Sequence, residues 1–147
     1  MVRGMAHPYK HMISLDNAVG AFGSIDPRLR ELMKIRASQL NGCAYCLKMH
    51  TDDARKLGED EARMHVLAGW REAPKVFDER ERAAIALTEA VTLMREPGDA
   101  YDAAKELFGE KDAEALLWQA IAINAWNRFA VTRHTEPEFE EARTAAA

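Results

Sequence analysis

Three residues that could carry redox chemistry lie close together in the sequence: Cys43, Cys46 and His50. The two cysteines are the only ones in the chain, and the histidine follows one helical turn after the second. On a helix, positions i, i+3 and i+7 share one face, so two thiols and an imidazole would form a short column. Such a dithiol can cycle between thiol and disulfide while the imidazole accepts or returns a proton near neutral pH. The spacing therefore indicates a thiol-based redox enzyme.

The column requires a helix that begins near Cys43. Asn41-Gly42 is a plausible stop for a preceding helix, and Gly58 is a plausible C-terminal residue for a helix over about 43–57. Cys46 would then lie in the first turn, where free backbone N–H groups and the helix dipole favour a thiolate. If Cys46 attacks a peroxide it becomes a sulfenic acid, and Cys43 is near enough to condense with it to a disulfide. We expect the inward face of this helix to comprise Cys43, Cys46, Leu47, His50, Ala54 and Leu57.

The remaining elements also have helical patterns, so we predict an all-α fold. Asp26-Pro27 is a helix start signal, and Asp78 followed by Glu81 resembles a capping box. Apolar periodicity and breakers then predict helices over about 27–41, 59–68, 78–94, 99–108 and 111–131, with a connection at 69–77. The last helix is apolar nearly all round, which indicates a central position or partial burial by another subunit. No repeat or linker is evident, so residues 1–147 are predicted to form a single domain.

Composition excludes several classes of function. A net charge of −4 and a pI near 5.7 argue against nucleic acid as the main partner. No apolar run approaches the roughly 20 residues of a membrane span, and residues 1–22 lack the apolar segment of a signal peptide. We therefore expect a cytosolic location with no membrane partner. Structural disulfides are uncommon there, so a close cysteine pair favours redox chemistry or metal binding.

The segment from Glu31 through His50 closely resembles the alkylhydroperoxidase D-like branch of the carboxymuconolactone decarboxylase family. The resemblance continues through residues 53–59 and 79–84, with weaker similarity at 124–128, and covers a core of about residues 16–131. It implies the all-α fold of that family, with the C-x-x-C motif at the N-terminus of a central helix. It also implies a homo-oligomer, either a trimer or a hexamer.

The resemblance assigns roles to four residues. Cys46 would form the sulfenic acid, and Cys43 would act as proton donor and resolving partner. His50 and Glu31 would complete a proton relay. The implied activity is reduction of organic hydroperoxides in antioxidant defence, with a dithiol protein or small thiol as reductant and no cofactor, because the thiols supply both electrons. Some peroxidase members carry a second histidine where this chain has Tyr45, so we predict that Tyr45 orients peroxide or water in a slower relay.

Other interpretations use the same residues differently. The cysteines could be two small buried hydrophobic residues, or Cys43, Cys46 and His50 could be three ligands of a zinc-binding module. A non-enzymatic adaptor passing electrons to a peroxiredoxin would use the same dithiol, whereas lactone decarboxylases of the family typically lack the paired cysteines. Glu31 could instead form an exposed salt bridge with Lys34.

Buried polar groups in the last helix need partners. Asn124 and Asn127 are expected to bond to backbone or to a neighbouring helix rather than to substrate. The three tryptophans are expected to be core or interface anchors.

Overall fold

Six α-helices and one 3₁₀ helix form the computed structural model, which describes residues 7–139 and contains no strand in that range. The prediction of an all-α fold is confirmed. In chain order the elements are α1 (Pro8–Ala21), α2 (Pro27–Asn41), α3 (Ala44–Lys56), α4 (Glu61–Val66), η1 (Leu67–Glu72), α5 (Glu79–Leu93) and α6 (Pro97–Thr132).

Several helix ends follow the predicted capping signals. Asp26 accepts a backbone N–H bond at the start of α2, and Pro27 occupies the first helical position. Gly42 ends α2 with φ = 66°, a left-handed conformation that costs glycine little. Asp78 caps α5 by accepting the backbone N–H of Glu81. The end of α2 at Gly42 fixes where α3 begins, and hence where the two cysteines lie.

Other boundaries differ from the prediction. The helix expected from residue 59 begins at Glu61, because Asp60 accepts two backbone N–H bonds as its N-cap. The chain then continues as η1 through part of the expected connection. The two helices expected after Pro97 form one element, α6, interrupted by non-helical backbone at Gly109 (φ 80°, ψ 168°). The break at this glycine is therefore confirmed.

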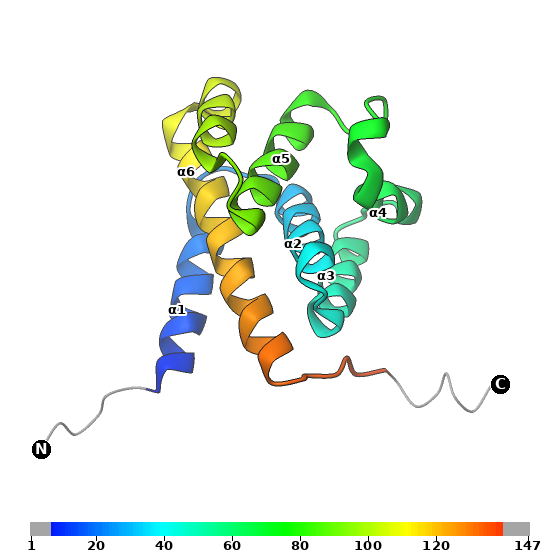
Figure 1. Cartoon of the computed structure of the whole chain (residues 1–147), viewed down its shortest axis with the longest axis vertical. Coiled ribbons are helices and arrows are strands. Elements are labelled where there is room, and N and C mark those ends of the chain that lie inside the picture. Colours follow the sequence, from blue (N-terminus) through cyan, green and yellow to red (C-terminus); the bar gives the residue numbers. More distant parts are fainter. Residues whose placement is uncertain (1–6, 140–147) are drawn as a thin grey trace, which may run out of the picture.

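The hydrophobic core lies around α2, α5 and α6. α6 packs against α5 and α2, and α2 also contacts α3 and α5 (Figure 1). One cluster joins α2, α5 and α6 through Met33, Leu87 and Leu116, and a second lies beneath α4 and η1 around Phe77 and Leu67. The central position of α6 is confirmed, although some of its apolar side chains remain exposed.

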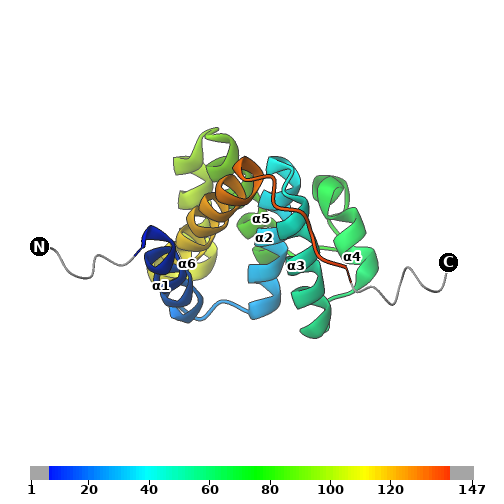
Figure 2. The same cartoon turned by 90° about the horizontal axis from the view of Figure 1, so that it is seen from below.

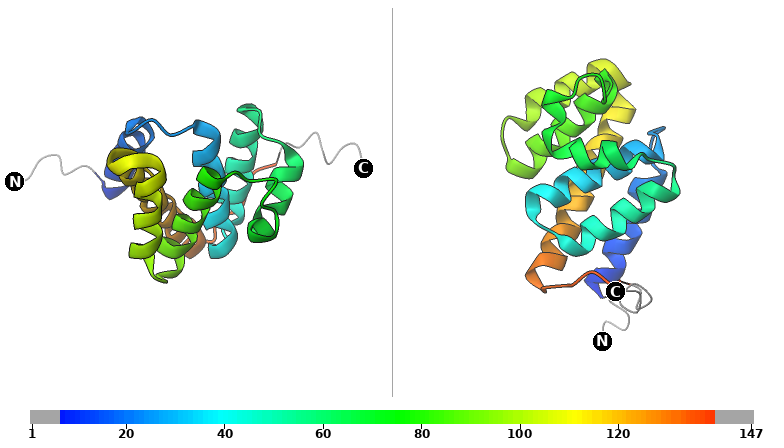
Figure 3. Two further views of the ribbon diagram at one scale, coloured as in Figure 1. Left: turned by 90° about the horizontal axis from the view of Figure 1, so that it is seen from above. Right: turned by 90° about the vertical axis from the view of Figure 1, so that its right-hand side faces the viewer.

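α1 is a helix whose boundaries were not predicted. Only Val19 of this helix is buried. α1 lies beside the C-terminal half of α6, as two views show (Figure 1 and the right panel of Figure 3). It therefore forms an outer wall rather than part of the core.

The described part of the C-terminal segment, residues 133–139, passes from the end of α6 across the face of α3 (Figure 2). The backbone N–H of Thr135 donates to the carbonyl of Ala130, and Lys48 of α3 lies over the ring of Phe139. None of the helices within residues 7–139 is long and apolar enough to cross a membrane.

Candidate active site

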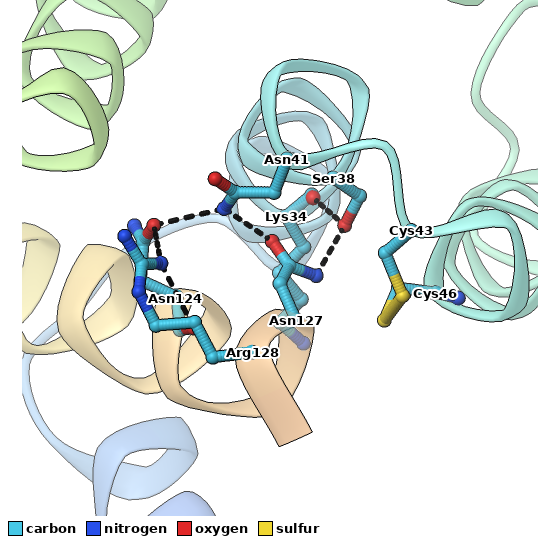
Figure 4. Close-up of a disulfide and its surroundings, with 8 residues drawn as sticks. All are labelled: Lys34, Ser38, Asn41, Cys43, Cys46, Asn124, Asn127 and Arg128. Carbon is cyan, nitrogen blue, oxygen red and sulfur yellow. Dashed lines mark hydrogen bonds between the residues drawn. A yellow bond between two sulfur atoms is a disulfide. The ribbon is translucent and has the colours of Figure 1, made fainter. Parts of the chain in front are cut away.

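The two cysteines lie at the N-terminus of α3, as predicted. Cys43 is the N-cap residue, and the backbone N–H of Cys46 donates to its Sγ at 3.3 Å. The sulfurs are joined in a disulfide (Figure 4), and both side chains are almost completely buried. Cys46 thus lies in the first helical turn, where the N-terminal amides and dipole favour negative charge on sulfur once the pair is reduced.

The inward face of α3 largely matches the expectation. Cys46, His50 and Ala54 are buried, and Leu47 packs partly against the second core cluster. Leu57 is the exception, because it is the C-cap residue and its side chain is 44% exposed. Its assignment to the inward face was wrong. The helix ends at Lys56, so the helical spacing no longer determines the direction of the Leu57 side chain.

A network of buried amides holds the turn that precedes Cys43 (Figure 4). Asn41 Nδ2 donates to Oδ1 of both Asn124 and Asn127 at 2.9 Å, and Asn127 Nδ2 donates to Ser38 Oγ at 3.0 Å. The carbonyl of Ser38 in turn accepts the backbone N–H of Cys43 at 3.0 Å. The two asparagines of α6 therefore bond to a neighbouring helix, as predicted, and tie it to the cysteine turn.

Glu31 and His50 form a buried pair between α2 and α3. Glu31 Oε2 lies 2.9 Å from His50 Nδ1, and Glu31 Oε1 accepts a bond from Lys34 Nζ at 2.8 Å. The salt bridge with Lys34 that was considered as an alternative exists, but it is not exposed, because the Glu31 side chain is only 8% exposed. α2 turns this face toward α3, so the carboxylate bridges a lysine and a histidine.

The charge of Glu31 determines which ring nitrogen of His50 carries a proton. Burial acts to raise the pKa of Glu31, but the hydrogen bond from His50 and the charge of Lys34 outweigh it and leave that pKa below its ordinary value. An ionised carboxylate can only accept, so Nδ1 of His50 must carry the proton between them. In the neutral imidazole Nε2 is then the proton acceptor.

A cavity of about 300 Å³ lies beside the disulfide. Cys46, His50 and Tyr45 line it, whereas Cys43 and Glu31 do not. Of the four predicted catalytic residues, Cys46 and His50 therefore line the cavity, whereas Cys43 and Glu31 do not. Tyr45 is half-buried and packs against the cysteines.

A second part of the cavity wall comes from residues that the sequence did not identify as site residues. α1 contributes Tyr9, Ile13 and Asp16, and α6 contributes Trp126 and Phe129. The only available signal was the spacing of the three α1 residues, which places them on one helical face. Of the three tryptophans, Trp70 is a core residue as expected, while Trp126 is half-buried in this wall.

One group of potential metal ligands occurs within residues 7–139. Glu31, His50 and Asp53 each bring a donor atom within 4.8 Å of the others. Two of these groups already have cationic partners, because Glu31 pairs with Lys34 and Asp53 with Lys56. The zinc set considered from the sequence differs, and its two sulfurs are bonded to each other here, so they are not thiolate ligands in this state.

Comparisons with known proteins show what this chain is similar to. Residues 7–90 match the model of the Carboxymuconolactone decarboxylase family, and this range includes both cysteines, His50 and Glu31. An uncharacterized protein of Bacillus subtilis, YdfG, is 42% identical over 74% of this chain and 75% of its own length.

Two solved structures have a similar fold. A protein of unknown function from Agrobacterium tumefaciens, described as a candidate antioxidant defence protein AhpD, is 34% identical, with a TM-score of 0.83 over 91% of this chain and 92% of that chain. The debrominase Bmp8, solved alone and as a cysteine-to-alanine variant with 2,3,4-tribromopyrrole, is 18% identical, with a TM-score of 0.77 over 88% of this chain and 70% of that one. The debrominase likeness concerns the fold alone.

Proposed function

Because the chain belongs to the carboxymuconolactone decarboxylase family and is alkylhydroperoxidase D-like, we propose that it is a thiol-dependent peroxidase that reduces organic hydroperoxides. One observation carries this proposal. Of the two cysteines, only Cys46 lines the cavity, and it does so together with His50. A small substrate in the cavity thus meets one sulfur and one imidazole, while the second sulfur is already placed to close the disulfide.

The first chemical step transfers one oxygen atom. In the reduced enzyme the Cys46 thiolate attacks the O–O bond of the hydroperoxide, an S–O bond forms, and the O–O bond breaks. Cys46 is oxidised to a sulfenic acid, and the alkoxide leaves with the electron pair of the broken bond. Protonation of the alkoxide by the imidazolium of His50 gives the alcohol.

The second step closes the disulfide. The thiol of Cys43 attacks the Cys46 sulfenic sulfur, the S–S bond forms, and hydroxide leaves and is protonated to water. The product is the Cys43–Cys46 disulfide found in the structure. A dithiol protein or small thiol then returns two electrons by thiol–disulfide exchange.

Glu31 and His50 supply the proton transfers in this scheme. The ionised carboxylate fixes the tautomer in which Nε2 accepts the Cys46 proton, and it stabilises the imidazolium that results. Tyr45, also in the cavity wall, donates a hydrogen bond to the peroxide oxygen or to water.

Two other activities predict different behaviour. An adaptor that passes electrons to a peroxiredoxin would exchange disulfides without consuming peroxide, and a lactone decarboxylase would not need the cysteines. Bmp8 acts as a debrominase on the same fold, so peroxide turnover must be measured directly.

We also propose that the protein is a cytoplasmic homo-oligomer, either a trimer or a hexamer. Support comes from Trp118 and Ile121, large apolar side chains of α6 that are about 40% exposed in the single chain. Light scattering after size-exclusion chromatography measures the assembly; a monomeric mass would contradict this part of the proposal.

The proposed reaction is tested by peroxide consumption with dithiothreitol as reductant. Cys46→Ser is expected to abolish turnover. In the absence of dithiothreitol, Cys43→Ser, the matched control at the other sulfur, is expected to consume one equivalent of cumene hydroperoxide and to leave a sulfenic acid that dimedone traps. Full turnover by Cys46→Ser would overturn the mechanism.

A further inference from the structure

Three aromatic rings from two helices line the cavity that Cys46 also lines and form an aromatic wall. Tyr9 of α1 lies against Trp126 and Phe129 of α6, with ring centroids 5.4 and 5.5 Å apart. Trp126 and Phe129 are themselves 6.4 Å apart in an edge-to-face arrangement. Ile13 extends the same apolar surface by one helical turn of α1. This part of the cavity lining is therefore aromatic and apolar.

The charged groups of the cavity already have partners. Asp16 accepts the indole N–H of Trp126 at 3.2 Å, and the ammonium group of Lys34 bonds to Glu31 at 2.8 Å. A carboxylate or phosphate on a substrate would have to compete with Glu31 for Lys34 and would disturb the pair that orients His50. An uncharged substrate avoids this competition.

α1 has little other role in the fold. Only Val19 of this helix is buried, and Tyr9 and Ile13 are each 42% exposed. The hydrogen bond between Asp16 and Trp126 and the Tyr9 contacts hold α1 against α6. A helix that buries so little of itself, yet supplies three cavity residues, is positioned to bind what enters the cavity.

From this geometry we propose that α1 is the substrate-recognition wall of the site, and that Tyr9, Trp126 and Phe129 bind the aromatic group of an uncharged aryl hydroperoxide. The inference rests on the proposed peroxidase activity and narrows its substrate class. A cavity of about 300 Å³ lies at the lower end of the range for small-molecule sites, so it suits a single substituted ring. The ring packs on the aromatic wall while the hydroperoxide group faces Cys46. Hydrogen peroxide has no group that can use this wall.

Binding tests the wall without requiring turnover. The probe is 2-phenyl-2-propanol, the alcohol formed from cumene hydroperoxide, titrated calorimetrically into the oxidised protein. Tyr9→Ala is expected to weaken its binding about tenfold, the value of one aromatic contact, whereas Tyr9→Phe retains the ring and is expected to restore binding. Ile13→Ala, at a half-exposed position of the same surface, is also expected to weaken binding. Met94→Ala, at an exposed residue outside the cavity, is the matched control and is expected to bind as wild type does. Sodium benzoate, a charged aromatic, is expected to bind more weakly than the alcohol.

Turnover then separates this inference from the proposed function. We expect the reduced wild-type enzyme to prefer cumene hydroperoxide to hydrogen peroxide in kcat/KM, and Tyr9→Ala to reduce that preference about tenfold. No binding of the alcohol, equal binding by wild type and Tyr9→Ala, or tighter binding of benzoate would overturn the inference. If the alcohol binds in a Tyr9-dependent manner but no peroxide is consumed, the proposed function fails and the recognition wall stands. If both peroxides are consumed without preference, the function stands and the inference fails.

Discussion

Replacing Glu31 by glutamine removes the charge that holds His50 in its reactive tautomer, with almost no change of shape. In the wild-type protein Oε2 of Glu31 lies 2.9 Å from Nδ1 of His50, and the carboxylate is ionised because its pKa is held below the ordinary value. A glutamine amide can donate to Nδ1 instead of accepting from it. The imidazole would then carry its proton on Nε2 and could no longer accept the Cys46 proton.

The size of the effect follows from the geometry of this pair. A hydrogen bond to a charged group contributes roughly 1.5–3 kcal/mol, and about 1.36 kcal/mol corresponds to a tenfold change in rate. The Glu31 side chain is 8% exposed, so solvent screens this interaction little. We therefore expect kcat/KM for cumene hydroperoxide to fall about 10- to 100-fold in Glu31→Gln.

Stopped-flow measurement of the peroxide step from acid to alkaline pH is the assay for this variant. Glu61→Gln is the matched control, because Glu61 is an exposed carboxylate of α4 that pairs with Arg55 at the surface. Thermal melts of both variants establish that each is folded. A Glu31→Gln enzyme with the wild-type rate and pH profile would remove Glu31 from the proton relay.

Three further predictions concern stability. Gly23→Ala should destabilise the fold by about 1–3 kcal/mol in urea titrations, because the φ of Gly23 is 75° and a Cβ there would lie 2.7 Å from a neighbouring side chain. The control, Gly20→Ala, places its new Cβ with no atom within 4 Å and should be neutral or stabilising. Asn127→Ala should lower the free energy of unfolding by about 2–4 kcal/mol, because it leaves a cavity and unpaired hydrogen-bond partners, whereas Asn17→Ala at an exposed position should lower it little. Equal urea midpoints for the two variants would contradict a stabilising role of the buried amide network. The pKa of Glu31 is lowered in the folded state, so the stabilisation of the fold by its carboxylate should be complete above the ordinary pKa of 4.5 and should be lost as pH falls through the folded pKa. Urea titrations of wild type and Glu31→Gln at several pH values measure this difference. A difference in stability that favours wild type more strongly at acid pH would contradict the prediction.

The parts of the fold that could be predicted are those fixed by local signals. Asp26, Gly42 and Asp78 set helix ends through their own side chains or backbone conformation, and the structure confirms all three. The column of Cys43, Cys46 and His50 followed from helical spacing once the start of α3 was fixed. Their catalytic roles remain predictions.

The remaining features depend on contacts between segments far apart in the sequence. Glu31 has a satisfactory local partner in Lys34, so only the packing of α2 on α3 reveals its bond to His50. The aromatic wall likewise needs α1 and α6 side by side, because Tyr9 and Trp126 meet only in the folded chain. Periodicity reports which face of a helix is apolar, but not which other helix, or which cavity, that face will meet.

The most direct test of the central claim is the intact mass and free-thiol count of the reduced protein before and after one equivalent of cumene hydroperoxide, with Cys46→Ser alongside. We predict rapid loss of both thiols with no oxygen atom added to the mass, and no such reaction in Cys46→Ser. This result would demonstrate a peroxide-driven disulfide between Cys43 and Cys46. Thiols that stay reduced in the presence of peroxide, or that are lost equally in the variant, would contradict a peroxidase mechanism that begins at Cys46.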